Sequence, residues 1–384
     1  MSLKKKIYLD FNATTPVDNR VLETMLPYFT ENFGNASSDH VFGWDANEAV
    51  EFAREQIGNL INAKATGITF TSGATEAANL ALFGFCKANS SKGNHIISCK
   101  IEHKAVLDTL KALEQQGFKV TYLEVDAEGN IDLEDLKREI TSETILISLM
   151  LANNETGLIH PMQEIEKIVH SKGAKLMSDI TQAVGKFPVD LKELNLDIAI
   201  FSSHKLYGPK GVGALYINKK NNIEIDPTVF GGGQEKGMRP GTLNVPGIVG
   251  FGKAAEIAEA EMEEESIRIS KLRNGLEKQL SELEEVQINS KNSNRLPNTT
   301  NISFQNIDGN LMLRKLSNLA ISRGSACTSN TINPSHVLKA MGLNDELALA
   351  SFRISLGRST TQEHIDFAVE EIKSCLNQLK KVEV

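Results

Sequence analysis

The chain has 384 residues, of which 41% are hydrophobic and 23% are charged, as in an ordinary globular protein. This length exceeds that of a typical single core and predicts two domains. The formal net charge of -8 argues against broad binding to nucleic acid or anionic membranes, and no apolar run approaches the ~20 residues of a membrane helix. Residues 1–15 show neither a secretory signal nor a transit peptide, so we expect a cytosolic protein.

Short β-rich runs alternate with helical segments through the first two thirds of the chain. They predict seven strands, within residues 67–73, 95–100, 119–125, 144–154, 174–180, 197–205 and 211–217. Because these runs are continuously rich in Val, Ile and Leu and are separated by helices, we expect a mostly parallel sheet covered on both faces. Right-handed crossovers would place the strand C-termini, and a ligand site, along one edge.

The pattern changes near residue 254. A long acidic helix from residue 253 leads to strand-like runs at 286–290, 300–306, 319–329 and 351–357, and then to a closing helix from Thr361. This order indicates a smaller α+β domain. We therefore expect a large domain at residues 16–253 and a small domain formed by residues 1–15 and 254–384.

Three candidate groups lie at the C-terminal ends of predicted strands. Residues 72–75 precede a helix, where free backbone N–H groups form an anion site or, with Thr75 as the cap, an ordinary helix start. Asp179 is either a helix-capping residue or an acid that needs a cationic partner, and Gln182 could hydrogen-bond a neighbouring phenolate oxygen. Lys205 ends a buried strand, which suits an amine that forms an imine. An anion grip, a pyridinium partner and such an amine are what pyridoxal 5′-phosphate requires.

The chain has four cysteines and no C-x-x-C pair, so we expect no metal site. Cys86, Cys99 and Cys375 fall in apolar helix or strand patterns and are expected to be buried as small hydrophobic side chains. Cys327 lies among small polar residues. There we expect a flexible loop in which a thiolate could form and move.

As a set, the motifs resemble those of the class I cysteine desulfurases, pyridoxal-phosphate enzymes of fold type I in the class-V aminotransferase family. The matching segments are, in order, YLDFNATTP, SGATEAANLAL, EHKAVLDT, NNETG, QAVGK, SSHKLYGPKGVGALY, GGGQEKGMRPGT, RGSACTS and SFRISLGRSTT. They cover nearly the whole chain, and their shared order is far more specific than any one of them. The resemblance implies a fold-type I homodimer, each chain having the seven-stranded large domain and the smaller α+β domain.

The resemblance also implies a role for each candidate residue. Lys205 would hold the cofactor covalently, and Asp179 would keep its pyridine nitrogen protonated. His103 would stack over the ring and move protons, although it could be an ordinary histidine at a helix start. Arg353 would bind the substrate carboxylate, although it could instead satisfy backbone carbonyls at a domain junction. The other implied contacts are Gln182 to the ring's 3′ oxygen, Asn154 near cofactor and substrate, Ala74, Thr75, Ser202 and His204 on the phosphate, and Thr242 on the phosphate from a second subunit.

The implied reaction converts L-cysteine to L-alanine. Cys327 would take the substrate sulfur as a persulfide and deliver it to a protein acceptor such as an iron–sulfur scaffold, or to thiocofactor assembly. The long stretch after Cys327 resembles the long-loop class. Three alternatives are a selenocysteine lyase, an aminotransferase in which Cys327 would have no task, and a non-enzymatic relic of the fold. The presence of Lys205, Asp179 and His103 argues against the relic.

Some positions depart from the family pattern. Arg323 replaces a small residue near Cys327, where it could lower the thiol pKa or meet an acidic acceptor. Pro240 replaces Ser or Gly in the loop that carries Thr242, and Ala36 replaces a proline in GNASS. The sequence ends at LKKVEV without the extended tail with which iron–sulfur members hold their scaffold protein, so the sulfur acceptor stays open.

Overall fold

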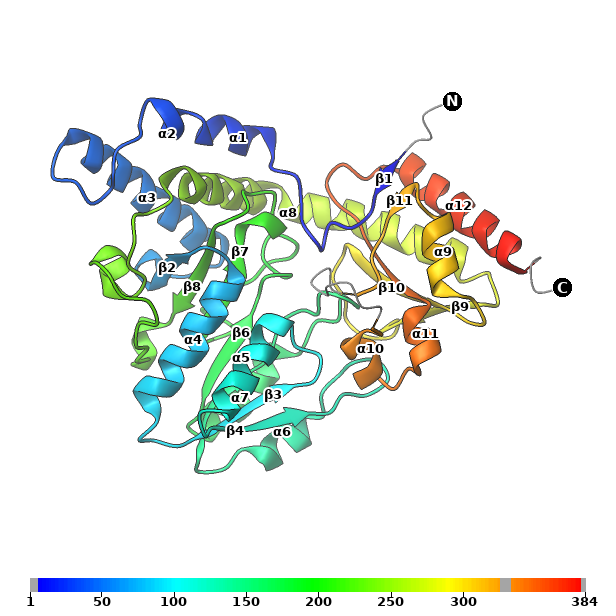
Figure 1. The fold of residues 1–384 in the computed structure, drawn as a ribbon, viewed down its shortest axis with the longest axis horizontal. Helices are drawn as coiled ribbons and strands as arrows, with labels where there is room; N and C mark the ends of the chain where they lie inside the picture. The colour runs from blue at the N-terminus through cyan, green and yellow to red at the C-terminus, as the bar shows by residue number, and fades with distance from the viewer. Residues whose placement is uncertain (1–5, 325–332, 381–384) are drawn as a thin grey trace.

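The computed structural model describes residues 6–324 and 333–380, so Cys327 lies outside the described residues. Its central element is a seven-stranded sheet (Figure 1). In spatial order the strands are β2 (Ile68–Thr71), β8 (Gly213–Ile217), β7 (Ile198–Ser202), β6 (Lys175–Asp179), β5 (Thr144–Ser148), β3 (His95–Cys99) and β4 (Lys119–Leu123). Strand β8 is antiparallel to both of its neighbours, whereas the other pairs are parallel. The mostly parallel sheet expected from the sequence is therefore confirmed.

Helices cover both faces of the sheet because successive strand residues point to opposite faces and both sets are apolar. Ile198 and Ile200 of β7 belong to one hydrophobic core, and Ala199 and Phe201 belong to another. The first core is completed by α4 (Ala74–Asn89) and α5 (Lys104–Glu114). The second is completed by α3 (Val41–Leu60), α6 (Leu133–Glu139), α7 (Met162–Ser171) and the first part of α8 (Val245–Leu280).

The smaller sheet lies at the other end of α8 (Figure 1). It is antiparallel, in the order β12 (Ser351–Ser355), β10 (Thr299–Phe304) and β9 (Val286–Asn289). It shares a separate core with the second part of α8, with the parallel pair β1 (Ile7–Tyr8) and β11 (Leu319–Ala320), and with α9 (Gly309–Lys315) and α12 (Gln362–Lys380). The strand-like runs predicted at 286–290, 300–306 and 351–357 and the closing helix are confirmed, whereas only Leu319–Ala320 of the run at 319–329 forms a strand and residues 325–329 lie outside the described residues.

Helix α8 begins eight residues before the acidic helix that the sequence predicted. The segment NVPGIVGFG contains Pro and Gly, which usually interrupt a helix, but Pro246 lies in the first turn, where proline is tolerated. The side chain of Asn244 caps this turn by accepting a hydrogen bond from the Gly247 N–H at 3.2 Å. Gly252 lets α8 approach α3, because a Cβ there would lie 2.6 Å from the Ala53 Cα. The predicted boundary at residues 253/254 thus falls inside one continuous helix that contributes to both cores.

Shorter elements complete the described chain. They are α1 (Asn19–Met25), α2 (Pro27–Thr30), α10 (His336–Ala340), α11 (Asp345–Leu349), and the 3₁₀ turns η1 (Ala65–Gly67), η2 (Ser203–Lys205), η3 (Lys219–Asn221) and η4 (Gln234–Gly237). Within residues 6–324 and 333–380, no helix is both long and apolar enough to cross a bilayer.

Candidate active site

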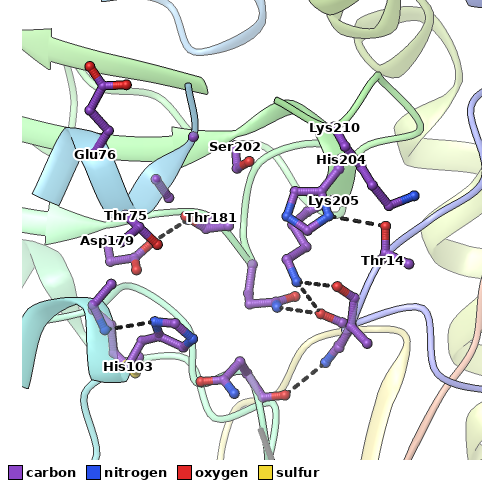
Figure 2. A pocket seen from close by; sticks show the side chains of 18 of the residues that line it. Thr14, Thr75, Glu76, His103, Asp179, Thr181, Ser202, His204, Lys205 and Lys210 are labelled. Atoms are coloured by element: carbon purple, nitrogen blue, oxygen red, sulfur yellow. Dashed lines mark hydrogen bonds between the residues drawn. The ribbon is translucent and has the colours of Figure 1, made fainter. Parts of the chain in front are cut away.

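A cavity of about 450 Å³ lies at the edge of the large sheet where β2, β6 and β7 end (Figure 2). These strands run in the same direction, since β6 is parallel to β7 and both β2 and β7 are antiparallel to β8. The structure brings together ten of the residues singled out from the sequence, which line this cavity: Ala74, Thr75, His103, Asn154, Asp179, Gln182, Ser202, His204, Lys205 and Arg353.

One end of the cavity has the properties of an anion site. Helix α4 starts there after Gly73 without any side-chain cap, so the alternative in which Thr75 caps the helix is wrong. A Cβ on Gly213 would lie 2.6 Å from the Gly73 Cα, so only glycine lets β8 pass this close to the turn. Since the N-terminus of a helix favours negative charge, this end of the cavity suits a phosphate.

His204 lies beside this end of the cavity, and its Nδ1 is 3.1 Å from the Thr14 hydroxyl. Burial lowers the pKa of His204 to about 4, with further lowering by the charges of Lys205, Lys210 and Lys186. The imidazole is therefore neutral near pH 7, and the positive charge at this end of the cavity comes from Lys210, which also lines it. A phosphate would meet an electropositive wall here.

Lys205 and Asp179 lie on different sides of the cavity (Figure 2). The Lys205 amine donates to the backbone carbonyls of Asn12 and Ala13, at 2.6 and 2.7 Å. Asp179 is buried at the end of β6, and one of its oxygens accepts the Thr181 N–H at 2.9 Å. An amine and an acid that face one space fit the aldehyde and the pyridinium of pyridoxal 5′-phosphate.

The amide of Gln182 already has partners at both ends. Its Nε2 donates to the Asn12 carbonyl at 3.1 Å, and its Oε1 accepts from Lys186. Burial lowers the pKa of Lys186 well below its usual value, and the charges of Lys205 and Arg353 lower it further. The amide NH2 has two N–H donors, so Gln182 can still donate to the ring oxygen while it keeps both of these hydrogen bonds.

His103 is the N-cap of α5, which was the ordinary role considered for it, and it also lines the cavity. Its Nδ1 accepts the Ala105 N–H at 3.1 Å, so the neutral ring carries its proton on Nε2. Figure 2 shows the ring on the same side of the cavity as Asp179. The preceding residue, Glu102, is fully buried, and burial together with the Asp179 charge raises its pKa well above the usual value.

Arg353 is almost fully buried and makes contacts of the kind expected if it links two parts of the chain. Its Nη1 donates to the Asn154 carbonyl at 2.9 Å, and its Nη2 pairs with Asp10 at 2.7 Å. Among the described residues, its Nε and the Thr181 hydroxyl, both in residues that line the cavity, are buried without a hydrogen-bond partner. The guanidinium thus keeps unused donors, Nε among them, that could serve a bound anion.

The sequence interpretation missed several residues of the cavity wall, among them Asn12, Thr14 and Lys210. Asn12 and Thr14 belong to the matched segment YLDFNATTP, which was the available signal. The backbone carbonyl of Asn12 accepts hydrogen bonds from Lys205 and Gln182. Because every residue type has this carbonyl, such a role cannot be recognised from the residue at position 12.

Some predicted residues lie away from the cavity. Thr242 is exposed on the loop between η4 and α8 and does not line the cavity. Arg323 donates to the Asn310 side chain at 2.8 Å. The other three cysteines are buried as predicted; burial raises the pKa of Cys86 to about 12, and raises those of Cys99 and Cys375 as well.

Residues 7–367 match the family model of the class-V aminotransferases. The chain belongs to the class-V aminotransferase family. It is 48% identical to the cysteine desulfurase IscS of Anaeromyxobacter sp. (strain Fw109-5), over 99% of this chain and 95% of that protein. It is 49% identical to the IscS of Neisseria meningitidis serogroup C, over 100% and 95% of the two chains.

Solved structures show the same similarity in three dimensions. A NifS-like protein superimposes with a TM-score of 0.91 and 40% identity, over 97% of this chain and all of that one. DndA from Streptomyces lividans superimposes with a TM-score of 0.77 and 39% identity, over 91% and 99% of the two chains. The predicted fold type, the dependence on pyridoxal 5′-phosphate and the placement among the cysteine desulfurases are therefore confirmed.

Proposed function

We propose that this chain converts L-cysteine to L-alanine and transfers the sulfur to Cys327 as a persulfide. The observation that carries the proposal is that Lys205, Asp179 and the uncapped start of α4 share one cavity, in a chain similar over its whole length to cysteine desulfurases. Bound pyridoxal 5′-phosphate supplies an electron sink for a negative charge that develops at the substrate's Cα.

The proposed roles of the cavity residues follow from their positions. Ala74, Thr75, Ser202 and His204 hold the phosphate, Asp179 holds the pyridine nitrogen, and Lys205 holds the aldehyde carbon. His103, which lines the cavity, would exchange protons with the substrate through Nε2, because its Nδ1 is engaged by the Ala105 N–H.

Substrate binding and sulfur transfer use the other side of the cavity. We propose that the unpartnered Nε of Arg353 holds the carboxylate of L-cysteine, next to Asn154. The Cys327 thiolate attacks the substrate sulfur, so that a sulfur–sulfur bond forms and the bond from sulfur to Cβ breaks. The electron pair of the broken bond stays with carbon, which takes up a proton to give alanine.

We also propose that the active form is a homodimer in which Thr242 reaches the phosphate of the other subunit's site. Thr242 is exposed on its own chain. Large apolar side chains are exposed in the α1–α3 region, at the end of the molecule opposite the small sheet (Figure 1): Leu22, Leu26, Phe29, Phe33, Val41, Phe42, Trp44 and Phe52. Such a surface is typical of a protein–protein contact. An iron–sulfur scaffold or another sulfur acceptor, and the cytosolic location, stay predictions.

The test supplies L-cysteine and a reductant and quantifies alanine and sulfide. We expect equal amounts of both products from the unaltered protein and neither from the Cys327→Ser variant. The variant should still retain the cofactor, which its visible absorption reports. Equal output from both proteins would refute transfer to Cys327.

A further inference from the structure

An acidic side chain lines the cavity at the end where the phosphate is proposed to bind. Glu76, in the first turn of α4, accepts the Ser72 N–H at 2.6 Å. Burial raises the pKa of Glu76, but the hydrogen bonds from Arg239 and Ser72 together outweigh this effect, so that the pKa lies below its usual value. Glu76 is therefore a charged carboxylate. In Figure 2 its carboxylate points away from Asp179 and Lys205.

This carboxylate and a phosphate would compete for the same helix end. A negative side chain in the first turn stabilises the empty helix through the macrodipole, but it repels a second anion there. The chain offsets that charge with Arg239, whose Nε and Nη2 donate to the two Glu76 oxygens at 2.7 and 3.2 Å. Only about a quarter of each side chain is exposed, so solvent screens the pair incompletely.

The loop that carries Arg239 is fastened close to the sheet. Glu235 has a left-handed backbone (φ +47°), which costs energy for a non-glycine residue. Its carboxylate is held by Arg54, with two hydrogen bonds of 2.8 Å, and by the Phe70 N–H at 2.8 Å. The Gln234 side chain accepts the Gly241 N–H at 3.0 Å and so holds the loop again beyond Arg239. Arg239 is therefore presented from an anchored loop.

We propose that Arg239 is a positioning residue of the cofactor site that acts through Glu76. It neutralises the carboxylate and keeps it on the Ser72 N–H, so that the start of α4 can accept a phosphate dianion. The inference rests on the proposed placement of the phosphate at residues 74–75, 202 and 204. It predicts that losing Arg239 weakens phosphate binding because the negative charge of Glu76 is then no longer neutralised.

A double-mutant cycle tests this because a purely structural role for Arg239 gives a different pattern. The probe is pyridoxine 5′-phosphate, which has the phosphate but no aldehyde, and its binding to the apoprotein is measured by equilibrium dialysis. We expect Arg239→Gln to weaken binding roughly fivefold, and Glu76→Gln to leave it unchanged or tighter. The double variant should recover at least half of the loss on a logarithmic scale.

Lys87→Gln is the matched control. Lys87 lies in the last turn of the same helix and pairs with Asp226 at 3.2 Å, so this variant removes one positive charge from α4 far from the cavity. Its binding of the probe should equal that of the unaltered protein, and thermal unfolding of each apoprotein checks folding.

Two outcomes would overturn the inference: an Arg239→Gln variant that binds as tightly as the unaltered protein, or a loss that persists in full in the double variant. The second outcome would identify Arg239 as a support of the loop alone. If the unaltered protein binds pyridoxine 5′-phosphate no more tightly than pyridoxine, the proposed phosphate placement fails, and the inference with it.

Discussion

The two roles considered for Arg353 make different predictions for Arg353→Lys. The arginine makes two charge-assisted contacts, to the Asn154 carbonyl and to Asp10, while its Nε is unpartnered. Lysine keeps the positive charge but has no planar fork, so we expect it to keep one of the two contacts and to lose the Nε donor. A hydrogen bond to a charged group contributes about 1.5–3 kcal/mol, so the free energy of unfolding should fall by about that amount.

The kinetic effect separates the roles. If Nε holds the substrate carboxylate equally in the ground and transition states, KM for L-cysteine should rise on the order of tenfold or more, with kcat little changed. Denaturant unfolding of the holoprotein and steady-state alanine formation measure the two effects on one preparation. A fall in stability with an unchanged KM would refute the substrate role and leave Arg353 as a structural link between the two parts of the chain.

Two further predictions concern the sheet that supports the site. His170 bridges Asp197 and Glu166, with both contacts at 2.7 Å, and the hydrogen bond that its Nε2 donates to Asp197 is the main cause of its raised pKa, against the lowering by burial. The stabilisation is therefore complete below the unfolded pKa of about 6.5 and is lost as the pH rises through the raised folded-state pKa. In the His170→Gln variant this loss of stability with rising pH should be absent. Denaturation midpoints that change in parallel with pH in the variant and the unaltered protein would contradict this prediction. Gly213→Ala would place a Cβ 2.6 Å from the Gly73 Cα, so we expect the free energy of unfolding to fall by about 1–3 kcal/mol, measured by denaturation. The variant should also retain the cofactor less well in dialysis. Unchanged retention would argue against the phosphate placement.

The large sheet could be predicted because parallel strands buried on both faces are continuous apolar runs. The ends of those runs also indicated Asp179 and Lys205, since parallel strands bring their C-termini to one edge. The start of α8 was missed because proline and glycine have different effects in a first helical turn and in a helix interior.

Contacts between distant parts of the chain were outside the reach of such patterns. Arg353 and Asp10 are 343 residues apart, and Glu76 and Arg239 are 163 apart. The carbonyls that receive Lys205 belong to a loop before α1, and a carbonyl group is present in every residue. Sequence reasoning therefore identified the chemistry of the site but not the residues that hold it in place.

The most direct test of the account asks which amine carries the cofactor. The holoprotein is treated with borohydride, which fixes the link between cofactor and lysine, and the peptides are mapped by mass. Lys186 is the discriminating alternative, because its amine lies 3.3 Å from the side-chain oxygen of Asn12, a residue of the cavity wall. We predict that the pyridoxyl group is found on Lys205, and finding it on Lys186 or on neither lysine would contradict the account.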